Sequence, residues 1–183
     1  MGFHLMGGPM ALAGRVDLEE RRQAALDLLT QYIRIVDDPR RIEEWPALFS
    51  DDAEYIVITR ENHERNLPIA VIRDDSKDRI ADRVTIIREF WGAGGRAADR
   101  HYNDAWPRHV VGPVWVEFSE SGDALVGANF AVYQSVQVDV APRLLAVGEY
   151  KDVVEFSGAT ATYKAKKVIL DTSVLQDVFV YPL

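Results

Sequence analysis

The chain divides into a first half with helical periodicity and a second half in which apolar and polar residues alternate. From Asp17 onward, apolar residues recur three and four positions apart, as on one face of a helix. They are Leu18, Ala25, Leu28, Leu29, Tyr32, Ile33 and Val36. Asp17 and Glu20 suit the N-cap and N3 positions, and Asp38-Pro39 ends the stripe because a residue before proline avoids helical angles. The pattern predicts an amphipathic helix from Leu18 to about Val36.

Four short segments and a third helix are predicted next. The segments are a helix over 41–49 with Ile42, Trp45 and Phe49 inward, a β-rich strand over 53–59, a polar loop over 60–67 and a brief strand over 69–72. Asp75 or Ser76 then caps a helix in which Ile80, Val84, Ile87 and Trp91 form an apolar stripe. The glycines between 92 and 95 end that helix.

Strict alternation marks the rest of the chain. Strands are predicted over about 107–118, 124–137, 143–156 and 161–170, with an edge strand over 174–181. In the second of them Val126, Ala128, Phe130, Val132 and Val136 point one way, and Leu125, Asn129, Tyr133 and Ser135 point the other. Helices followed by a strand meander predict an α+β fold, with one curved antiparallel sheet packed on the N-terminal helices. We expect residues 17–183 to form a single domain and residues 1–16 a disordered tail.

Five apolar side chains are predicted on the sheet face turned away from the helices: Trp115, Leu125, Tyr133, Leu145 and Val147. Such a group suggests a covered surface, and we expect it to be a subunit interface through which the free chain oligomerises. A half-solvated face with a few apolar residues is the alternative. Val168-Ile169-Leu170 is apolar on both sides, which predicts a strand buried on both faces.

Composition excludes several kinds of chemistry. The chain has no cysteine, so it cannot form disulfides, thiolate nucleophiles or cysteine-ligated iron–sulfur clusters, a Rieske centre included. The 21 basic and 29 acidic residues give a net charge of −8, which argues against a nucleic-acid partner. No run of 18 apolar residues suits a membrane span, and we expect a cytoplasmic protein.

Few residues suggest a reactive site. The four histidines, His4, His63, His101 and His109, show no spacing typical of a metal site, and we expect His109 to have a packing role in a strand. Arg60, Glu61 and Asn62 are expected to anchor a loop or an interface, with ligand binding as an alternative. Arg108 invites the same interpretation. Lys164, Lys166 and Lys167 form a small basic patch, expected on a solvated strand face.

Six motifs spread over the chain carry a family resemblance. They are Leu-Phe-Ser-Asp-Asp-Ala-Glu-Tyr at 48–55, Arg-Glu-Asn at 60–62, Ala-Asn-Phe-Ala-Val-Tyr-Gln at 128–134, Val-Gly-Glu-Tyr-Lys-Asp at 147–152, Leu-Asp-Thr at 170–172 and Val-Tyr-Pro-Leu at 180–183. In this respect the chain resembles the small (beta) subunits of aromatic-ring-hydroxylating dioxygenases, in the branch that acts on benzoate, anthranilate, salicylate or terephthalate. It departs from that pattern at Gly112-Pro113, Glu149 and Tyr163, where asparagine, a basic residue and tryptophan are usual.

The resemblance implies a cone-shaped fold like that of nuclear transport factor 2, also called SnoaL-like or cystatin-like. It implies a non-catalytic structural subunit, present as a homotrimer within an alpha3beta3 oxygenase for aromatic compound catabolism. The Rieske [2Fe-2S] cluster and the mononuclear Fe(II) would sit on the partner alpha subunit, and this chain would hold no cofactor or metal. It leaves the aromatic substrate unassigned.

A stand-alone enzyme or binding protein of the same fold is the alternative. Such a protein would dehydrate or isomerise a small aromatic or polyketide ligand. Its candidate residues are Tyr55, His109 and Glu149, although no spacing in the sequence brings two of them together.

Overall fold

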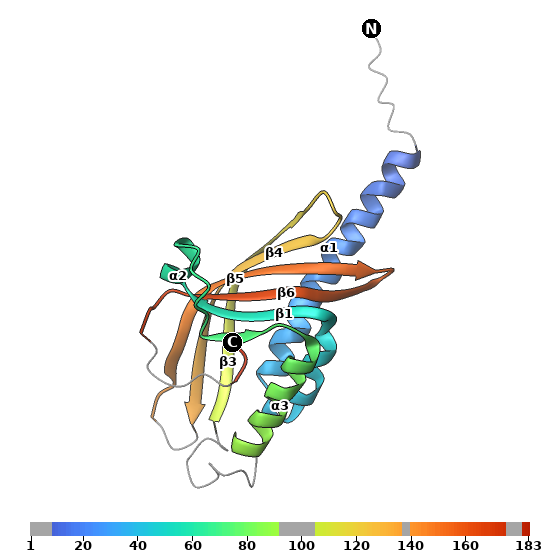
Figure 1. The fold of residues 1–183 in the computed structure, drawn as a ribbon. Helices are drawn as coiled ribbons and strands as arrows, with labels where there is room; N and C mark the ends of the chain where they lie inside the picture. The colour runs from blue at the N-terminus through green and yellow to red at the C-terminus, as the bar shows by residue number, and fades with distance from the viewer. Residues whose placement is uncertain (1–8, 92–104, 137–139, 175–180) are drawn as a thin grey trace.

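Six strands form one curved sheet that is covered on one face by helices (Figure 1). The computed structural model describes residues 9–91, 105–136, 140–174 and 181–183. The elements are α1 (Pro9–Val36), the 3-10 helix η1 (Pro39–Leu48), β1 (Phe49–Thr59), α2 (Arg60–Glu64), β2 (Ile72–Asp74), α3 (Lys77–Trp91), β3 (Ala105–Phe118), β4 (Ala124–Val136), β5 (Arg143–Ser157) and β6 (Thr160–Leu170). The predicted α+β architecture is confirmed.

The strand order is β2-β1-β6-β5-β4-β3, and one pair departs from the predicted pattern. Strands β3 to β6 form an antiparallel meander, but β1 runs parallel to β6, so the sheet is mixed and not wholly antiparallel. Parallel pairing needs a long connection, and here everything from α2 to β5 separates the two strands. Because β6 lies between β1 and β5, its apolar end is buried on both faces, as predicted.

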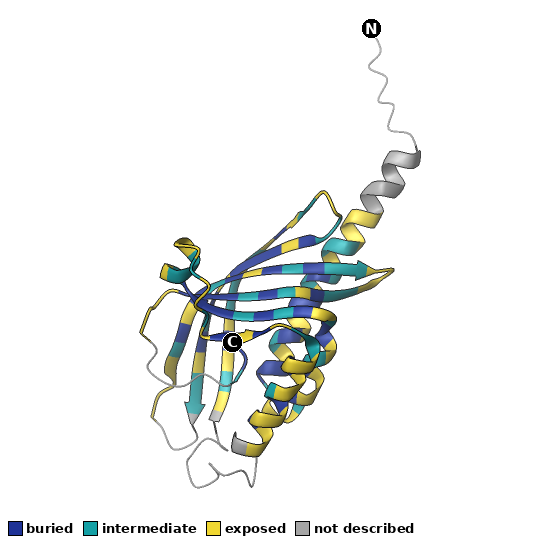
Figure 2. Cartoon of the chain, viewed as in Figure 1, coloured by how far each residue is buried: buried dark blue, intermediate teal, exposed yellow. Residues whose placement is uncertain are grey.

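Helix α1 crosses the sheet with one buried face. Its buried side chains are Ala25, Leu28, Leu29, Tyr32, Ile35 and Val36. The helix begins at Pro9, so the predicted start at Leu18 is wrong. Leu18 is also 47% exposed, because the N-terminal part of α1 projects beyond the edge of the sheet (Figures 1 and 2). No helix in the described ranges is both long and apolar enough to cross a membrane.

The segment after β1 differs from its prediction in two places. Residues 60–64 form the short helix α2 and not a loop, because the Thr59 hydroxyl accepts a hydrogen bond from the Asn62 backbone N–H and caps its first turn. The second strand covers Ile72–Asp74 and not 69–72. Ser76 caps α3 as expected. The predicted helix end at 92–95 and most of the predicted edge strand over 174–181 lie outside the described residues.

A β-bulge between β4 and β5 changes which leucine is exposed. Val132 lies opposite Ala146, but Tyr133 lies opposite Leu144, so Leu145 is an extra residue. Leu145 therefore packs against the core and Leu144 is 48% exposed. The prediction that Leu145 lies on the far face is wrong, because strict alternation fails at a bulge. A second register shift lies in β3 between Val111 and Val114.

Gly148 in β5 lies where the neighbouring strand leaves no room for a side chain. A β-carbon at this position would overlap the Ile169 carbonyl of β6, which is backbone and cannot rotate away. We expect Gly148→Ala to lower the free energy of unfolding by about 1–3 kcal/mol in urea denaturation. The control is Gly112→Ala in β3, where the nearest atom would be the Asn129 carbonyl at 3.5 Å. It should change stability by less than about 0.5 kcal/mol, and equal losses in the two variants would contradict the packing described.

Candidate functional site: the outer sheet face and the protein interior

The outer face, defined as the side of β3, β4 and β5 turned away from the helices, carries a group of exposed apolar residues. Its members are Val110, Trp115, Leu125, Tyr133, Leu144 and Val147, whose side chains are between 38% and 55% exposed. They are neighbours across the strands: Val110 and Val147 both lie opposite Ala131, and Leu144 lies opposite Tyr133. Asn129 and Glu149, which lie opposite one another on β4 and β5, separate Trp115 and Leu125 from the other four residues. Exposed apolar residues gathered on one face of a sheet are typical of a binding face.

Glycine shapes the middle of the outer face. Trp115 lies opposite Gly127, and a β-carbon at Gly127 would overlap the indole ring. The ring therefore lies flat over the neighbouring strand, where a tryptophan and a glycine together leave a smooth apolar surface. Sequence alternation predicted Trp115, Leu125, Tyr133 and Val147 in this surface, but it missed two members. Val110 could have been found from its alternation with His109, whereas Leu144 was hidden by the bulge.

A group of charged residues borders the outer face. The Arg60 guanidinium donates two hydrogen bonds to Asp171 Oδ1, at 2.8 and 2.6 Å. Its Nη1 also lies 3.6 Å from a Glu149 carboxylate oxygen, and Lys151 Nζ lies 3.7 Å from the same oxygen. The hydrogen bonds to Asp171 raise the pKa of Arg60. Arg60 thus ties the start of α2 to the segment that follows β6.

Glu61 and Asn62 also bond within the chain. Glu61 pairs with Arg65 one turn later at 2.8 Å, and the Asn62 side-chain amide donates to the Ile69 carbonyl at 2.9 Å. These bonds hold the polypeptide between α2 and β2. A role of Arg60, Glu61 and Asn62 in contacts with another chain stays a prediction.

A buried polar pair joins the residue after α1 to β3. His109 Nδ1 lies 2.7 Å from Asp37 Oδ1, and the same oxygen accepts the His109 backbone N–H at 2.9 Å. A carboxylate can only accept, so Nδ1 carries the proton. His109 Nε2 is buried and has no hydrogen-bond partner within the described part of the chain. Arg108, which is largely exposed, places Nη1 3.6 Å from the other Asp37 oxygen.

Among the candidate catalytic residues, and within the described part of the chain, only His109 has a partner of the kind that acid–base catalysis needs, and that partner is Asp37. Sequence reasoning named His109 but missed Asp37, because 72 positions separate them and only tertiary structure joins them. Tyr55 and Glu149 do not reach His109. The Tyr55 hydroxyl accepts a hydrogen bond from the Leu183 N–H, and Glu149 pairs with Arg60 and Lys151. An imidazole that is oriented by a carboxylate at Nδ1 can accept a proton at Nε2 and so act as a general base.

A buried ion pair lies between β5 and β6. Lys166 Nζ donates to Asp152 Oδ2 at 2.9 Å, and both side chains are fully buried. The ammonium lies 4.1, 3.8 and 5.0 Å from the ring centres of Tyr32, Tyr150 and Tyr163. This arrangement is a cation–π cage. The predicted solvated position of Lys166 is wrong. A register shift leaves Lys164 as an extra residue in β6, so Lys166 points inward with Val168 although Tyr163 is buried as well.

Burial sets the protonation behaviour of the pair. It lowers the pKa of the Lys166 ammonium and raises the pKa of the Asp152 carboxyl, and the attraction between the two groups opposes both shifts. Asp152 Oδ1 and the hydroxyls of Tyr150 and Tyr163 are buried without a hydrogen-bond partner among the described residues. Polar atoms in such positions usually bind ordered water.

No group of three or more His, Cys, Asp or Glu side chains suited to a metal ion occurs among the described residues. The expectation that iron and the Rieske cluster sit on another chain stays a prediction. The chemistry that the described side chains can offer is proton transfer at His109, ion pairing at the border of the outer face, and apolar contact on that face.

Comparison with known proteins assigns the class of protein. A solved NTF2-like protein with a cystatin-like fold from Novosphingobium aromaticivorans aligns with a TM-score of 0.66 at 18% identity, covering 92% of this chain and 94% of that one. This likeness confirms the predicted cone-shaped fold. The family model for the ring hydroxylating beta subunit matches residues 33–177. The chain therefore belongs to the ring-hydroxylating beta-subunit family.

Individual relatives agree. The anthranilate 1,2-dioxygenase small subunit of Burkholderia cepacia is 26% identical over 85% of this chain and 90% of its own length. A beta subunit of the terephthalate 1,2-dioxygenase terminal oxygenase from Comamonas is 24% identical over 83% and 92%. The solved beta subunit assigned to an aromatic-ring-hydroxylating dioxygenase of N. aromaticivorans has a TM-score of 0.75 at 30% identity, covering 91% of this chain and 99% of that one.

A double-mutant cycle tests the buried ion pair. Lys166→Met leaves the Asp152 carboxylate without its cation, and we expect the free energy of unfolding to fall by about 3–5 kcal/mol. The combined variant Lys166→Met/Asp152→Leu should recover most of this loss, because no uncompensated charge remains. Urea denaturation of the unchanged protein, of Lys166→Met, of Asp152→Leu and of the double variant measures both effects. Additive losses would show that the two side chains do not depend on one another.

The buried tyrosines predict a loss of stability at high pH. Burial raises the pKa of Tyr32, Tyr150 and Tyr163 well above the ordinary value, and that of Tyr55 to about 12. The unfolded chain loses these protons near pH 10, so stability must fall as pH rises beyond that point. Tyr55 alone contributes on the order of 2 kcal/mol to this loss between about pH 10 and pH 12. The lowered pKa of Lys166 acts in the opposite sense, but only below the pKa of an unfolded lysine at about 10.4.

Ultraviolet absorbance of tyrosinate, followed together with unfolding by circular dichroism, measures this effect. Tyr163→Phe is the matched control, because it removes a buried hydroxyl that has no partner among the described residues. That variant should keep its stability at neutral pH and lose stability less steeply above pH 10. Ionisation of the buried tyrosines near pH 10 in the folded chain would contradict the prediction.

Proposed function

We propose that this chain is the non-catalytic beta subunit of an aromatic-ring-hydroxylating dioxygenase that acts in aromatic compound catabolism. It stabilises an alpha3beta3 oxygenase, and the alpha subunit carries the Rieske cluster and the mononuclear iron. The observation that carries this proposal is the outer face, an exposed apolar surface bordered by charged residues on a chain of this family. The absence of cysteine supports it, because this chain has no thiolates for a Rieske centre.

The outer face has the composition of an interface core. Trp115 and Tyr133 are aromatic residues of the kind enriched in interfaces, and the apolar residues around them lie on three adjacent strands. Arg60, Glu149 and Lys151 at its border supply the polar rim. The backbone below is a hydrogen-bonded sheet, so little ordering cost accompanies binding. We therefore assign this face to contacts within the assembly, with other copies of the chain or with the alpha subunit.

A stand-alone proton-transfer enzyme is the second candidate, and the Asp37–His109 pair favours it. The pair orients an imidazole whose Nε2 has no partner in the described ranges. Against it stands the burial of that nitrogen, which leaves a substrate no evident approach. Turnover of a small aromatic or polyketide substrate by the isolated chain, lost in Asp37→Asn, would favour the second candidate over the first.

A charge on the outer face tests the proposed role. Leu125→Glu replaces one of the exposed apolar side chains of the outer face by a carboxylate, and we expect association with a cognate alpha subunit to weaken at least about tenfold. Co-expression followed by size-exclusion chromatography with light scattering measures the mass of the complex. The control is Ile86→Glu on α3, since Ile86 is 44% exposed and Leu125 is 43% exposed.

The control variant should assemble like the unchanged protein. The isolated chain should also self-associate, and Leu125→Glu should lower its mass toward that of a monomer. Failure of the unchanged chain to co-elute with a cognate alpha subunit would contradict the proposed function. Equal assembly of the two variants would show that the outer face is not the interface.

A further inference from the structure

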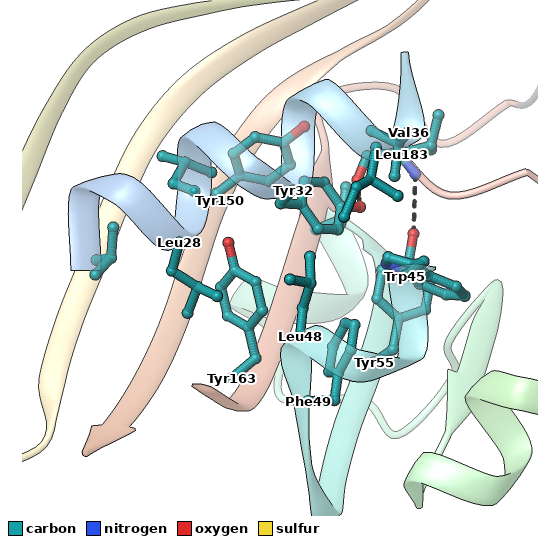
Figure 3. Packing of buried hydrophobic residues seen from close by; sticks show 14 of the residues in the cluster. Leu28, Tyr32, Val36, Trp45, Leu48, Phe49, Tyr55, Tyr150, Tyr163 and Leu183 are labelled. Atoms are coloured by element: carbon teal, nitrogen blue, oxygen red, sulfur yellow. Dashed lines mark hydrogen bonds between the residues drawn. The ribbon is translucent and has the colours of Figure 1, made fainter. Parts of the chain in front are cut away.

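Leu183 lies in the interior of the protein, far in sequence from the elements that surround it. It is 2% exposed and lies among side chains of α1, η1 and β1, as Figure 3 shows for Val36, Trp45 and Tyr55. Leu183 belongs to the core cluster and is not a surface residue that happens to be covered. The aromatic residues around it, Tyr32, Trp45 and Tyr55, are themselves completely buried.

Two tyrosine hydroxyls bind the backbone of Leu183, one as a hydrogen-bond acceptor and the other as a donor. The Tyr55 hydroxyl accepts the Leu183 N–H at 3.0 Å, and the Tyr32 hydroxyl donates to the Leu183 carbonyl at 2.6 Å. Both partners are side chains, one from β1 and one from α1, so no strand ladder or helix holds Leu183. An apolar wall with one donor and one acceptor is how a small-molecule site is built.

Tyr181, two residues before Leu183, extends this site toward Asp37. Tyr181 is partly buried against the core, and its hydroxyl has no hydrogen-bond partner in the described ranges. Burial and the nearby carboxylates of Asp38 and Asp37 raise the pKa of Tyr181. The segment 181–183 thus fills interior space between the tyrosines and the end of α1.

We infer that Tyr32, Tyr55 and the apolar residues beside them form a binding site for a small apolar carboxamide, and that residues 181–183 of the chain itself occupy this site. The ligand class follows from the contacts. An N–H is needed for Tyr55, a carbonyl for Tyr32, and a branched aliphatic group for the space that the leucine side chain fills. This inference goes beyond the proposed function, because it concerns the interior and does not require an alpha subunit.

A variant that lacks residues 181–183 tests the inference, with N-acetyl-leucinamide as the probe. Removing the occupant should lower the melting temperature of the isolated chain by about 5–15 °C. Millimolar N-acetyl-leucinamide should restore several degrees to the shortened variant and none to the full chain, whose site is filled. N-acetyl-glycinamide, which lacks the aliphatic group, should bind at least about tenfold more weakly.

Polar recognition is tested in the same shortened background. Tyr32→Phe/Tyr55→Phe keeps the apolar wall but removes both hydroxyls, and it should weaken N-acetyl-leucinamide binding about tenfold. If the shortened variant does not fold alone, recovery of its circular dichroism by N-acetyl-leucinamide but not by N-acetyl-glycinamide supports the inference, and no recovery overturns it. A melting temperature unchanged by the truncation, or an equal response to both amides, also overturns it. Assembly with the alpha subunit is a separate measurement, so the two proposals can fail independently.

Discussion

The ion pair between Lys166 and Asp152 is the constraint on which the arrangement of the interior depends. Two opposite charges are fully buried, and each is tolerated only while the other is present. The pair is built into strand register, since Asp152 lies directly opposite Lys166 in the β5–β6 ladder. A slip of one residue would turn one of the charges to the other face. Tyr32 completes the cage from α1, so its contact with the ammonium also positions the helix on the sheet.

The two faces of the sheet serve different purposes because of this interior. The inner face is closed by aromatic rings that meet edge to face, such as Trp45 against Phe49 and Tyr55 (Figure 3). The outer face presents its apolar residues on the other side of this packed, hydrogen-bonded sheet. Membership of the ring-hydroxylating beta-subunit family and an exposed apolar face are the two observations that support the proposed structural role.

The interior of this fold holds both the Asp37–His109 pair and the buried residue Leu183. Asp37 and His109 have the geometry of an acid–base pair. The hydroxyls of Tyr32 and Tyr55, which could bind a ligand nearby as donor and acceptor, are hydrogen-bonded to Leu183. Fold alone does not decide between catalysis and assembly, because function is set by which side chains remain accessible. Of the groups discussed above, the exposed apolar residues on the outer face are the accessible ones.

Local pattern determined most of the elements of this protein, and tertiary structure decided their partners. Alternation was enough to place β3 to β6 and most of the outer face, since neighbouring residues on a strand point to opposite sides whatever the strand pairs with. The family could be read from short motifs, and the lack of cysteine excluded a Rieske centre on this chain. Leu145 was misplaced because a bulge is a property of two paired strands and leaves no mark on one of them. The parallel pairing of β1 with β6, the Asp37–His109 pair, the burial of Lys166 and the position of Leu183 join residues that are distant in sequence or depend on what covers a strand. Only the packed chain specifies these contacts, because each depends on which surfaces meet and not on the residues that flank them.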